Sequence, residues 1–136
     1  MNAISQWWQD ATFYHIYPLG LCGAPLQNDF KTVNRLEALY PWLDQMQALG
    51  MDSLYLGPIF QSTSHGYDTM DYYRIDSRLG TNEDFARFAA ELHRRGMKLV
   101  LDGVFNHTSS DSLYFDKYSR YTTLGAYESE SSPYYS

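Results

Sequence analysis

The apolar residues of this sequence form short β-type runs that alternate with segments of helical periodicity. Residues 11–17 (ATFYHIY) are a β-branched and aromatic run closed by Pro18 and Gly20, and residues 53–57 (SLYLG) form a second run. Residues 97–105 (MKLVLDGVF) are almost continuously apolar, which is the pattern of a strand covered on both faces in the interior of a parallel sheet. The sequence therefore predicts three strands.

A helix is predicted within residues 34–49, where the apolar side chains fall on one face. Proline has no N–H group and clashes with the preceding turn of a helix. We therefore expect the main helix to begin near Tyr40 and Pro41, with the proline in its first turn, and to end at Gly50.

A second helix is predicted over residues 82–95, with clear signals at both ends. Thr81 and Asp84 have the spacing of a capping box, and Gly96 follows the last turn. The adjacent Arg94 and Arg95 suit the negative end of the helix dipole. The order strand, helix, strand, helix, strand predicts an α/β fold, with neighbouring parallel strands and helices packed outside them.

Two segments lack a clear period. Residues 61–80 read as a polar, glycine-containing loop, and a loop of that length is usually functional or a misassigned element. Residues 109–136 are rich in Ser and Tyr, show no helical period and are expected to be irregular. We therefore predict an ordered part at residues 1–108 and an irregular excursion at residues 109–136.

The composition excludes several classes of partner. The chain has 16 acidic and 10 basic residues and a formal net charge of −6, which disfavours nucleic acid or an anionic membrane because phosphate binding needs basic clusters. Its one cysteine, Cys22, allows no internal disulfide and no multi-cysteine zinc site, and we expect it to be a partly buried apolar side chain. The first twenty residues show neither a signal peptide nor a membrane span, so a cytoplasmic location is expected.

The aromatic content, 17% of the residues, has two explanations. The rings could fill an aromatic-rich core, or they could form a surface on which sugars stack. Composition does not separate these alternatives.

Polar residues that could carry chemistry follow the predicted strands. Ligands of α/β proteins gather at the carboxyl ends of the strands. The second strand leads to a loop with His65, Tyr67 and Asp68, and the third contains Asp102 and ends in Asn106-His107. These side chains are therefore expected on one face of the fold.

Each of these residues also has a structural explanation. A carboxylate inside an apolar strand needs donors, which backbone groups or a nearby Arg could supply to Asp102. Asn106 could cap the turn after the strand or offer its carbonyl oxygen to calcium, and His107 could donate to a ligand hydroxyl. A transition-metal site made of Asp102, His107 and His65 is conceivable, but no pair has a diagnostic spacing.

Three segments together resemble the α-amylase family of glycoside hydrolases. They are Phe13–Pro18 (FYHIYP), Ser64–Tyr73 (SHGYDTMDYY) and Asp102–His107 (DGVFNH), in the order and at the spacing of that family. The resemblance covers roughly residues 7–110 and implies a partial (β/α)8 barrel, namely its first three strands and two helices within residues 1–108. It also implies that residues 109–136 are the start of the segment that family members insert after the third strand. A complete barrel typically needs about 250 residues.

The resemblance also implies roles for the candidate residues. Tyr67 corresponds to the aromatic platform under the sugar at the cleavage site, and His65 and His107 to hydrogen-bond partners of its hydroxyl groups. Asp102 corresponds to a supporting residue of the site floor, and Asn106 to a calcium ligand of many family members. The implied ligand is an α-glucan or maltooligosaccharide.

The family's catalytic carboxylates belong to later motifs, which nothing in this sequence matches. Retaining glycoside hydrolysis needs two carboxyl groups at about 5–5.5 Å. Asp68, Asp71 and Asp102 are the local carboxylates, and the family assigns none of them those roles, so we expect no catalytic residue in this chain. The expected function is a part of an α-glucan-acting hydrolase. The alternatives are a noncatalytic glucan-binding or interaction module, or a truncated product without independent function.

Overall fold

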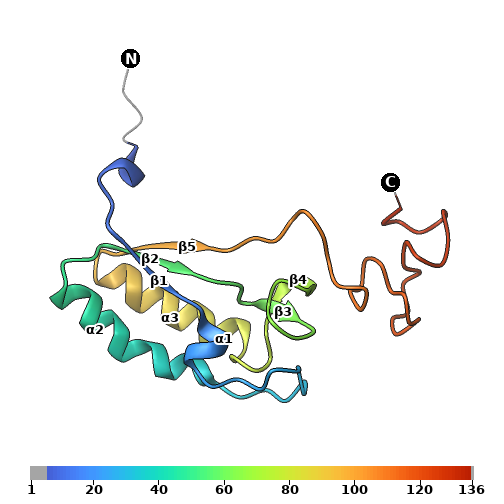
Figure 1. Cartoon of the computed structure of the whole chain (residues 1–136), viewed down its shortest axis with the longest axis horizontal. Helices are drawn as coiled ribbons and strands as arrows, with labels where there is room; N and C mark the ends of the chain where they lie inside the picture. The colour runs from blue at the N-terminus through green and yellow to red at the C-terminus, as the bar shows by residue number, and fades with distance from the viewer. Residues whose placement is uncertain (1–5, 136) are drawn as a thin grey trace.

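The computed structural model describes residues 6–135, and its centre is a sheet of three parallel strands (Figure 1). The strands β1 (Phe13–Ile16), β2 (Ser53–Leu56) and β5 (Lys98–Leu101) lie in the order β1-β2-β5. The register places His15 beside Tyr55 and Tyr55 beside Val100. The parallel sheet predicted from the alternating pattern is therefore confirmed.

Two helices, α2 (Tyr40–Ala48) and α3 (Asn82–Arg94), cover one face of this sheet (Figure 1). Their apolar faces and alternate residues of β1 and β2 form one buried cluster, in which most side chains are fully shielded from solvent. Its central members are Ile16, Leu43, Met46, Leu54, Leu56, Phe88 and Leu92. Because side chains alternate along a strand, His15, Tyr55 and Val100 lie on the opposite face.

The segment predicted as one helix over residues 34–49 consists of two elements. A 3-10 helix, η2 (Arg35–Leu39), precedes α2, and Pro41 stands in the first turn of α2, as expected. Pro41 cannot donate to the carbonyl of Glu37, which instead accepts from the Tyr40 N–H in a tighter turn. The missing donor therefore marks the boundary between the two helices.

The predicted limits of α3 are confirmed by its capping contacts. The Thr81 hydroxyl accepts from the Asp84 N–H at 3.1 Å, and the Asp84 carboxylate accepts from the Thr81 N–H at 2.8 Å. Gly96 follows the helix with φ of +76°, a conformation that favours glycine. At the last turn Arg95 pairs with Glu91 at 2.8 Å and with Asp44 of α2 at 2.6 Å.

The third predicted strand is shorter and more exposed than expected. Residues 97–105 were expected to be an interior strand, but β5 ends at Leu101 and lies at the edge of the described sheet. The last ladder bond runs from Asp102 N to Leu56 O at 3.0 Å, and beyond it the adjoining chain reaches Pro58, which has no N–H to donate. Only β2 pairs with β5 among residues 6–135, so its apolar side chains are half-buried.

The prediction of a loop at residues 61–80 was wrong. This region contains two antiparallel strands, β3 (Phe60–Ser62) and β4 (Thr69–Ile75), joined by a turn that carries His65 and Tyr67. Tyr72, Tyr73 and Ile75 are residue types that favour strands, but the charged Asp71 and Arg74 between them hide the alternation. The hairpin packs beyond the end of β2 (Figure 1).

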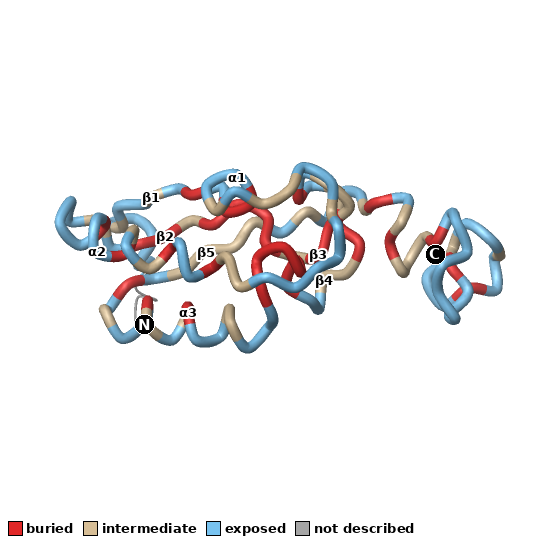
Figure 2. The backbone as a smooth tube through the Cα atoms, turned by 90° about the horizontal axis from the view of Figure 1, so that it is seen from below, coloured by how far each residue is buried: buried red, intermediate tan, exposed pale blue. Residues whose placement is uncertain are grey.

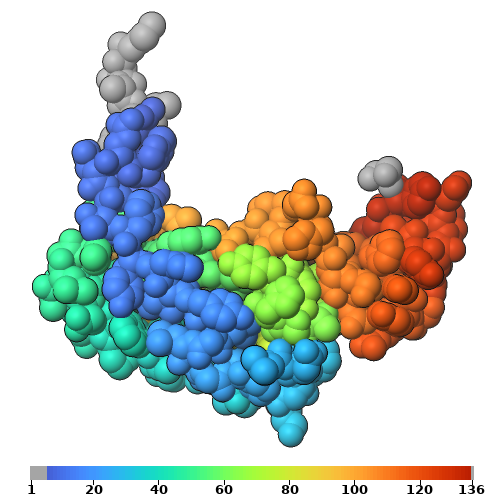
Figure 3. Space-filling model, viewed as in Figure 1, coloured from blue at the N-terminus to red at the C-terminus, as the bar shows by residue number. Residues whose placement is uncertain are grey.

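Smaller elements complete the fold. A 3-10 turn η1 (Trp7–Gln9) precedes β1, and a one-turn helix α1 (Pro18–Leu21) begins directly after it, so that β1 is shorter than the predicted 11–17. From Asp102 to Tyr135 the chain contains no helix or strand, and its last part forms a largely exposed lobe (Figures 2 and 3). Among residues 6–135, no helix has the length and apolar character needed to cross a membrane.

Candidate functional site

The three parallel strands end at the same edge of the sheet. Gly57 N donates to Ile16 O at 2.8 Å, and Asp102 N donates to Leu56 O at 3.0 Å. The residues that follow β1, β2 and β5 therefore begin side by side, which brings Tyr17 and Asp102 to the edge where the sequence predicted a ligand site.

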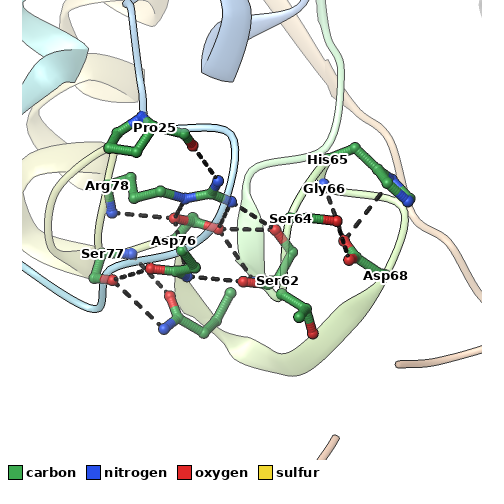
Figure 4. A network of polar contacts seen from close by, with 12 residues as sticks. Pro25, Ser62, Ser64, His65, Gly66, Asp68, Asp76, Ser77 and Arg78 are labelled. Atoms are coloured by element: carbon green, nitrogen blue, oxygen red, sulfur yellow. Dashed lines mark hydrogen bonds and ion pairs between the residues drawn. The ribbon is translucent and has the colours of Figure 1, made fainter. Parts of the chain in front are cut away.

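The turn at residues 63–68, between β3 and β4, is fixed from within by Asp68. Its carboxylate accepts from the Ser64 hydroxyl at 2.6 Å and from the Gly66 N–H at 3.2 Å (Figure 4). Gly66 has φ of +96°, and a Cβ atom there would lie 2.9 Å from the Pro58 ring. Only glycine fits this position without a shift of the backbone, which confirms the sharp bend expected from the sequence.

Two side chains from other segments bind the backbone of this turn. The Tyr17 hydroxyl donates to His65 O at 2.7 Å, and His107 Nε2 lies 3.0 Å from Tyr67 O. His107 reaches the turn because the chain after β5 runs along β4, where the Thr108 hydroxyl and the Ser109 N–H both donate to Thr69 O at 2.6 and 2.8 Å. The structure thus brings His65, Tyr67 and His107 together.

Asp102 lies directly after β5 rather than inside it, and it is half-buried. Its carboxylate accepts from the Tyr55 hydroxyl at 3.1 Å, so the required donor is a tyrosine instead of the expected Arg or backbone group. Burial, followed by the hydrogen bond to the Asp102 carboxylate and its charge, raises the pKa of Tyr55. Burial, followed by the nearby Asp102 carboxylate, raises the pKa of Tyr67. Both phenols are therefore protonated at neutral pH and can donate.

Aromatic side chains lie next to the Asp102 carboxylate. Tyr55 stacks on His15 with ring centroids 4.6 Å apart, on the sheet face opposite the helices. The Tyr67 ring is 41% exposed, which leaves much of its surface open to a ligand. An exposed ring next to a carboxylate with hydroxyl donors is the combination that binds a pyranose, whose apolar face stacks while its hydroxyls form hydrogen bonds.

The two imidazoles differ in what they offer. His65 Nδ1 accepts from the Tyr67 N–H at 3.2 Å, so Nε2 carries the proton in that tautomer and can donate to a ligand. His107 Nε2 donates to Tyr67 O when it is protonated, so in this arrangement its proton is used inside the protein. A direct bond from this atom to a sugar hydroxyl would require that contact to open.

Asn106, the predicted calcium ligand, is exposed, and its amide nitrogen lies 3.4 Å from His107 Nδ1. In the part of the chain from residue 6 to 135, no three His, Cys, Asp or Glu side chains group as a metal site. Calcium takes six to eight oxygen ligands. The Asn106 side chain offers a single amide oxygen, so the side chains of residues 6–135 do not by themselves form a calcium site.

The local carboxylates are engaged in the fold. Asp68 is bound within its own turn, Asp71 accepts from the Tyr73 N–H at 2.8 Å, and Asp102 accepts from Tyr55. Tyr55 was missed as a site residue in the sequence, although it pairs with Val100, two residues before Asp102, and therefore lies on the face of Asp102. The arrangement offers stacking and hydrogen bonding, and these contacts give no evidence of a nucleophile paired with a proton donor.

The family to which the chain belongs follows from comparison with known proteins. The profile of the family described as "Alpha amylase, catalytic domain" matches residues 28–136. The chain belongs to the α-amylase family. It is 48% identical over 102 residues to an amylopullulanase of Thermoanaerobacterium thermosulfurigenes, covering 74% of this chain and 5% of that protein. It is 36% identical over 114 residues to an oligo-1,6-glucosidase of Heyndrickxia coagulans, covering 82% of this chain and 20% of the relative.

Solved structures of α-amylase-family enzymes share the fold. A variant of isomaltulose synthase from Erwinia rhapontici, in complex with D-glucose, superposes with a TM-score of 0.74 at 31% identity, covering 98% of this chain and 22% of that one. The α-amylase-family chain described here therefore has the architecture of part of a (β/α)8 barrel, and it spans less than a third of the length of these relatives.

Proposed function

We propose that this chain supplies part of the α-glucan-binding site of a retaining glycoside hydrolase. The observation that carries the proposal is the contact between His107 and Tyr67 O at 3.0 Å, which gathers two sequence-distant motifs at the carboxyl edge of the sheet. The names of the relatives support the ligand class, since an amylopullulanase and an oligo-1,6-glucosidase both act on glucose polymers or oligomers.

In this proposal each residue acts on one glucose unit. The Tyr67 ring stacks on the apolar face of the sugar, and His65 donates from Nε2 to a hydroxyl. Asp102 accepts from a hydroxyl while Tyr55 holds the carboxylate in place at 3.1 Å. His107 holds the backbone of Tyr67, and it donates to the sugar only if that bond opens.

Calorimetry with maltoheptaose tests the binding. The wild-type chain is expected to give saturable heat, and Tyr67→Ala is expected to weaken the affinity about tenfold because it removes the stacking surface. Tyr73→Ala is the matched control, since Tyr73 lies on β4 of the same hairpin and is 83% exposed. Absence of saturable heat for the wild-type chain would favour the alternative of a product without independent function.

We further propose that residues 1–136 do not turn over substrate by themselves. The reason is that the motifs bearing the family's catalytic carboxylates have no counterpart in the sequence, and double displacement needs two such groups. Purified chain incubated with maltooligosaccharide is expected to release no reducing sugar. Sustained release that His107→Ala abolishes would overturn this proposal and reopen the assignment of a complete enzyme.

Calcium binding at Asn106 is a separate proposal. Its amide oxygen would be one ligand, with the others supplied by backbone carbonyls and water. Thermal unfolding with calcium and with chelator tests it. The expected result is a rise in the unfolding temperature with calcium that Asn106→Ala removes, and equal temperatures for the wild type would refute it.

A further inference from the structure

Asp76 and Arg78 form an ion pair that is completely buried behind the 63–68 turn. Both side chains are 0% exposed, and Arg78 Nη2 lies 2.8 Å from Asp76 Oδ2. Arg78 Nε donates to the other carboxylate oxygen, Asp76 Oδ1, at 2.9 Å (Figure 4). The two parallel bonds fix the relative orientation of the guanidinium and the carboxylate.

The remaining groups of the pair bind two other segments of the chain. Arg78 Nη1 donates to Pro25 O at 2.7 Å, in the loop after α1. Arg78 Nη2 also donates to the Ser62 hydroxyl at 3.0 Å, and that hydroxyl donates to Asp76 Oδ2 at 2.9 Å. The Ser62 N–H donates to the same oxygen at 3.1 Å. Ser62, the last residue of β3, is therefore held by both charges.

A second residue extends this network into the turn. The Asn28 side-chain amide donates to Ser62 O at 2.7 Å, and the Asn28 N–H donates to Thr63 O at 3.0 Å. The Thr63 N–H in turn donates to Asp68 O at 3.1 Å, which closes the turn that carries His65 and Tyr67. A continuous series of hydrogen bonds thus joins the buried charges to the candidate sugar-binding residues.

The loop held by Arg78 also borders the site. A hollow of about 240 Å³ lies beside His65, lined among others by Tyr17, Pro25, Leu26 and Arg78. The bond from Arg78 Nη1 to Pro25 O joins the loop on one side of this hollow to the ion pair. The pair therefore contacts two loops, the one that contains Pro25 and, through Ser62, the one that carries His65.

We propose that the Asp76–Arg78 pair is a positioning device that holds the 63–68 turn, and through it His65 and Tyr67, in the geometry that binds a glucose unit. This inference rests on the proposed function. A buried ion pair is often no more stabilising than apolar residues of the same size, so its fixed geometry is the property that an apolar pair lacks. Asp76 and Arg78 act through Ser62 and do not touch the ligand.

The test uses Ser62, because Ser62→Ala removes two of the three hydrogen bonds between Ser62 and the ion pair and leaves both charges in place. Amide hydrogen exchange of Thr63 and Gly66 is measured by NMR relative to the amides of α3, and maltoheptaose affinity is measured by calorimetry. We expect exchange in the turn to become at least tenfold faster and affinity about tenfold weaker. Ser62→Thr, which keeps the hydroxyl, is expected to restore both, and Asn28→Ala gives a second break if Ser62→Ala does not fold.

Glu91→Gln is the matched control, since it weakens the ion pairs of Glu91 with Arg94 and Arg95 at the end of α3, away from the 63–68 turn. Exchange in the turn that stays at the wild-type rate in Ser62→Ala would overturn the proposal, and so would faster exchange with unchanged affinity. Faster exchange in a chain whose wild type gives no heat with maltoheptaose would support the positioning of the turn and refute the glucan-binding proposal.

Discussion

Replacement of Arg78 by Met is expected to lower the free energy of unfolding substantially. The substitution removes five hydrogen bonds, to both Asp76 oxygens, the Ser62 hydroxyl, and the carbonyls of Pro25 and Leu26. It leaves a carboxylate that is 0% exposed. Removing one partner of a buried ion pair costs about 3–5 kcal/mol. Because four donors remain on Asp76, namely the N–H of Arg78, the N–H and hydroxyl of Ser62 and the side-chain amide of Asn28, we expect about 3–4 kcal/mol.

Urea unfolding followed by far-UV circular dichroism and Trp fluorescence measures this loss. With a denaturant slope of about 1–3 kcal/mol/M, the midpoint should fall by roughly 1–4 M. Asp76→Asn combined with Arg78→Met leaves no buried charge, so the double variant should lose less than the sum of the two single variants. A loss of less than about 1 kcal/mol for Arg78→Met, or single losses that simply add, would refute the assignment of a coupled buried pair.

Three further outcomes follow from the structure. Thr81→Ala removes the hydroxyl that caps α3 and should lower stability by about 1 kcal/mol in thermal or urea unfolding, and an unchanged midpoint would contradict the capping box. Hydrogen bonds from Arg94 and Arg95 lower the pKa of Glu91 from 4.5 to about 2, so the stability they add is present above pH 4.5 and is lost as the pH falls towards 2. Glu91→Gln should make the unfolding temperature depend less on pH over that range. A decline equal to that of the wild type would argue against the pairing. Burial, opposed by the Arg35 charge, raises the pKa of the Cys22 thiol to about 11. At pH 8 its reaction with a disulfide reagent should therefore be roughly a hundredfold slower than that of a free thiol, and the rate should rise about tenfold for each pH unit up to pH 10. A rate near that of a free thiol would show that the side chain is accessible.

Local signals made part of the fold predictable. The limits of α3 followed from Thr81, Asp84 and Gly96, because each acts on backbone groups within one turn of itself. The hairpin was missed because its strands pair irregularly, with shifts in register around Gln61, and depend on contacts with the loop after α1. The end of β5 was misplaced because it depends on Pro58 in a neighbouring segment, which a reading of residues 97–105 alone cannot include.

In the candidate site, too, residues in local motifs could be predicted and contacts between distant segments could not. His65, Tyr67, Asp102 and His107 could be named from their motifs, and the structure brings them together, while their role towards a sugar stays a prediction. Their supports are long-range: Tyr55 binds Asp102 over 47 positions of sequence, and Arg78 binds Pro25 over 53. Burial of a charged pair is a property of the packed molecule, and nothing in the residues next to Asp76 and Arg78 indicates it.

In the order β1-β2-β5, both β2 and β5 pair with the preceding strand of the same sheet. During synthesis β2 therefore meets a partner that has already left the ribosome, and β5 then adds to the free side of β2. The sheet can therefore form one strand at a time along the chain, while the loop at Pro25 is held only after Arg78 has been made. Among residues 6–135, the side of β5 opposite β2 has no strand partner.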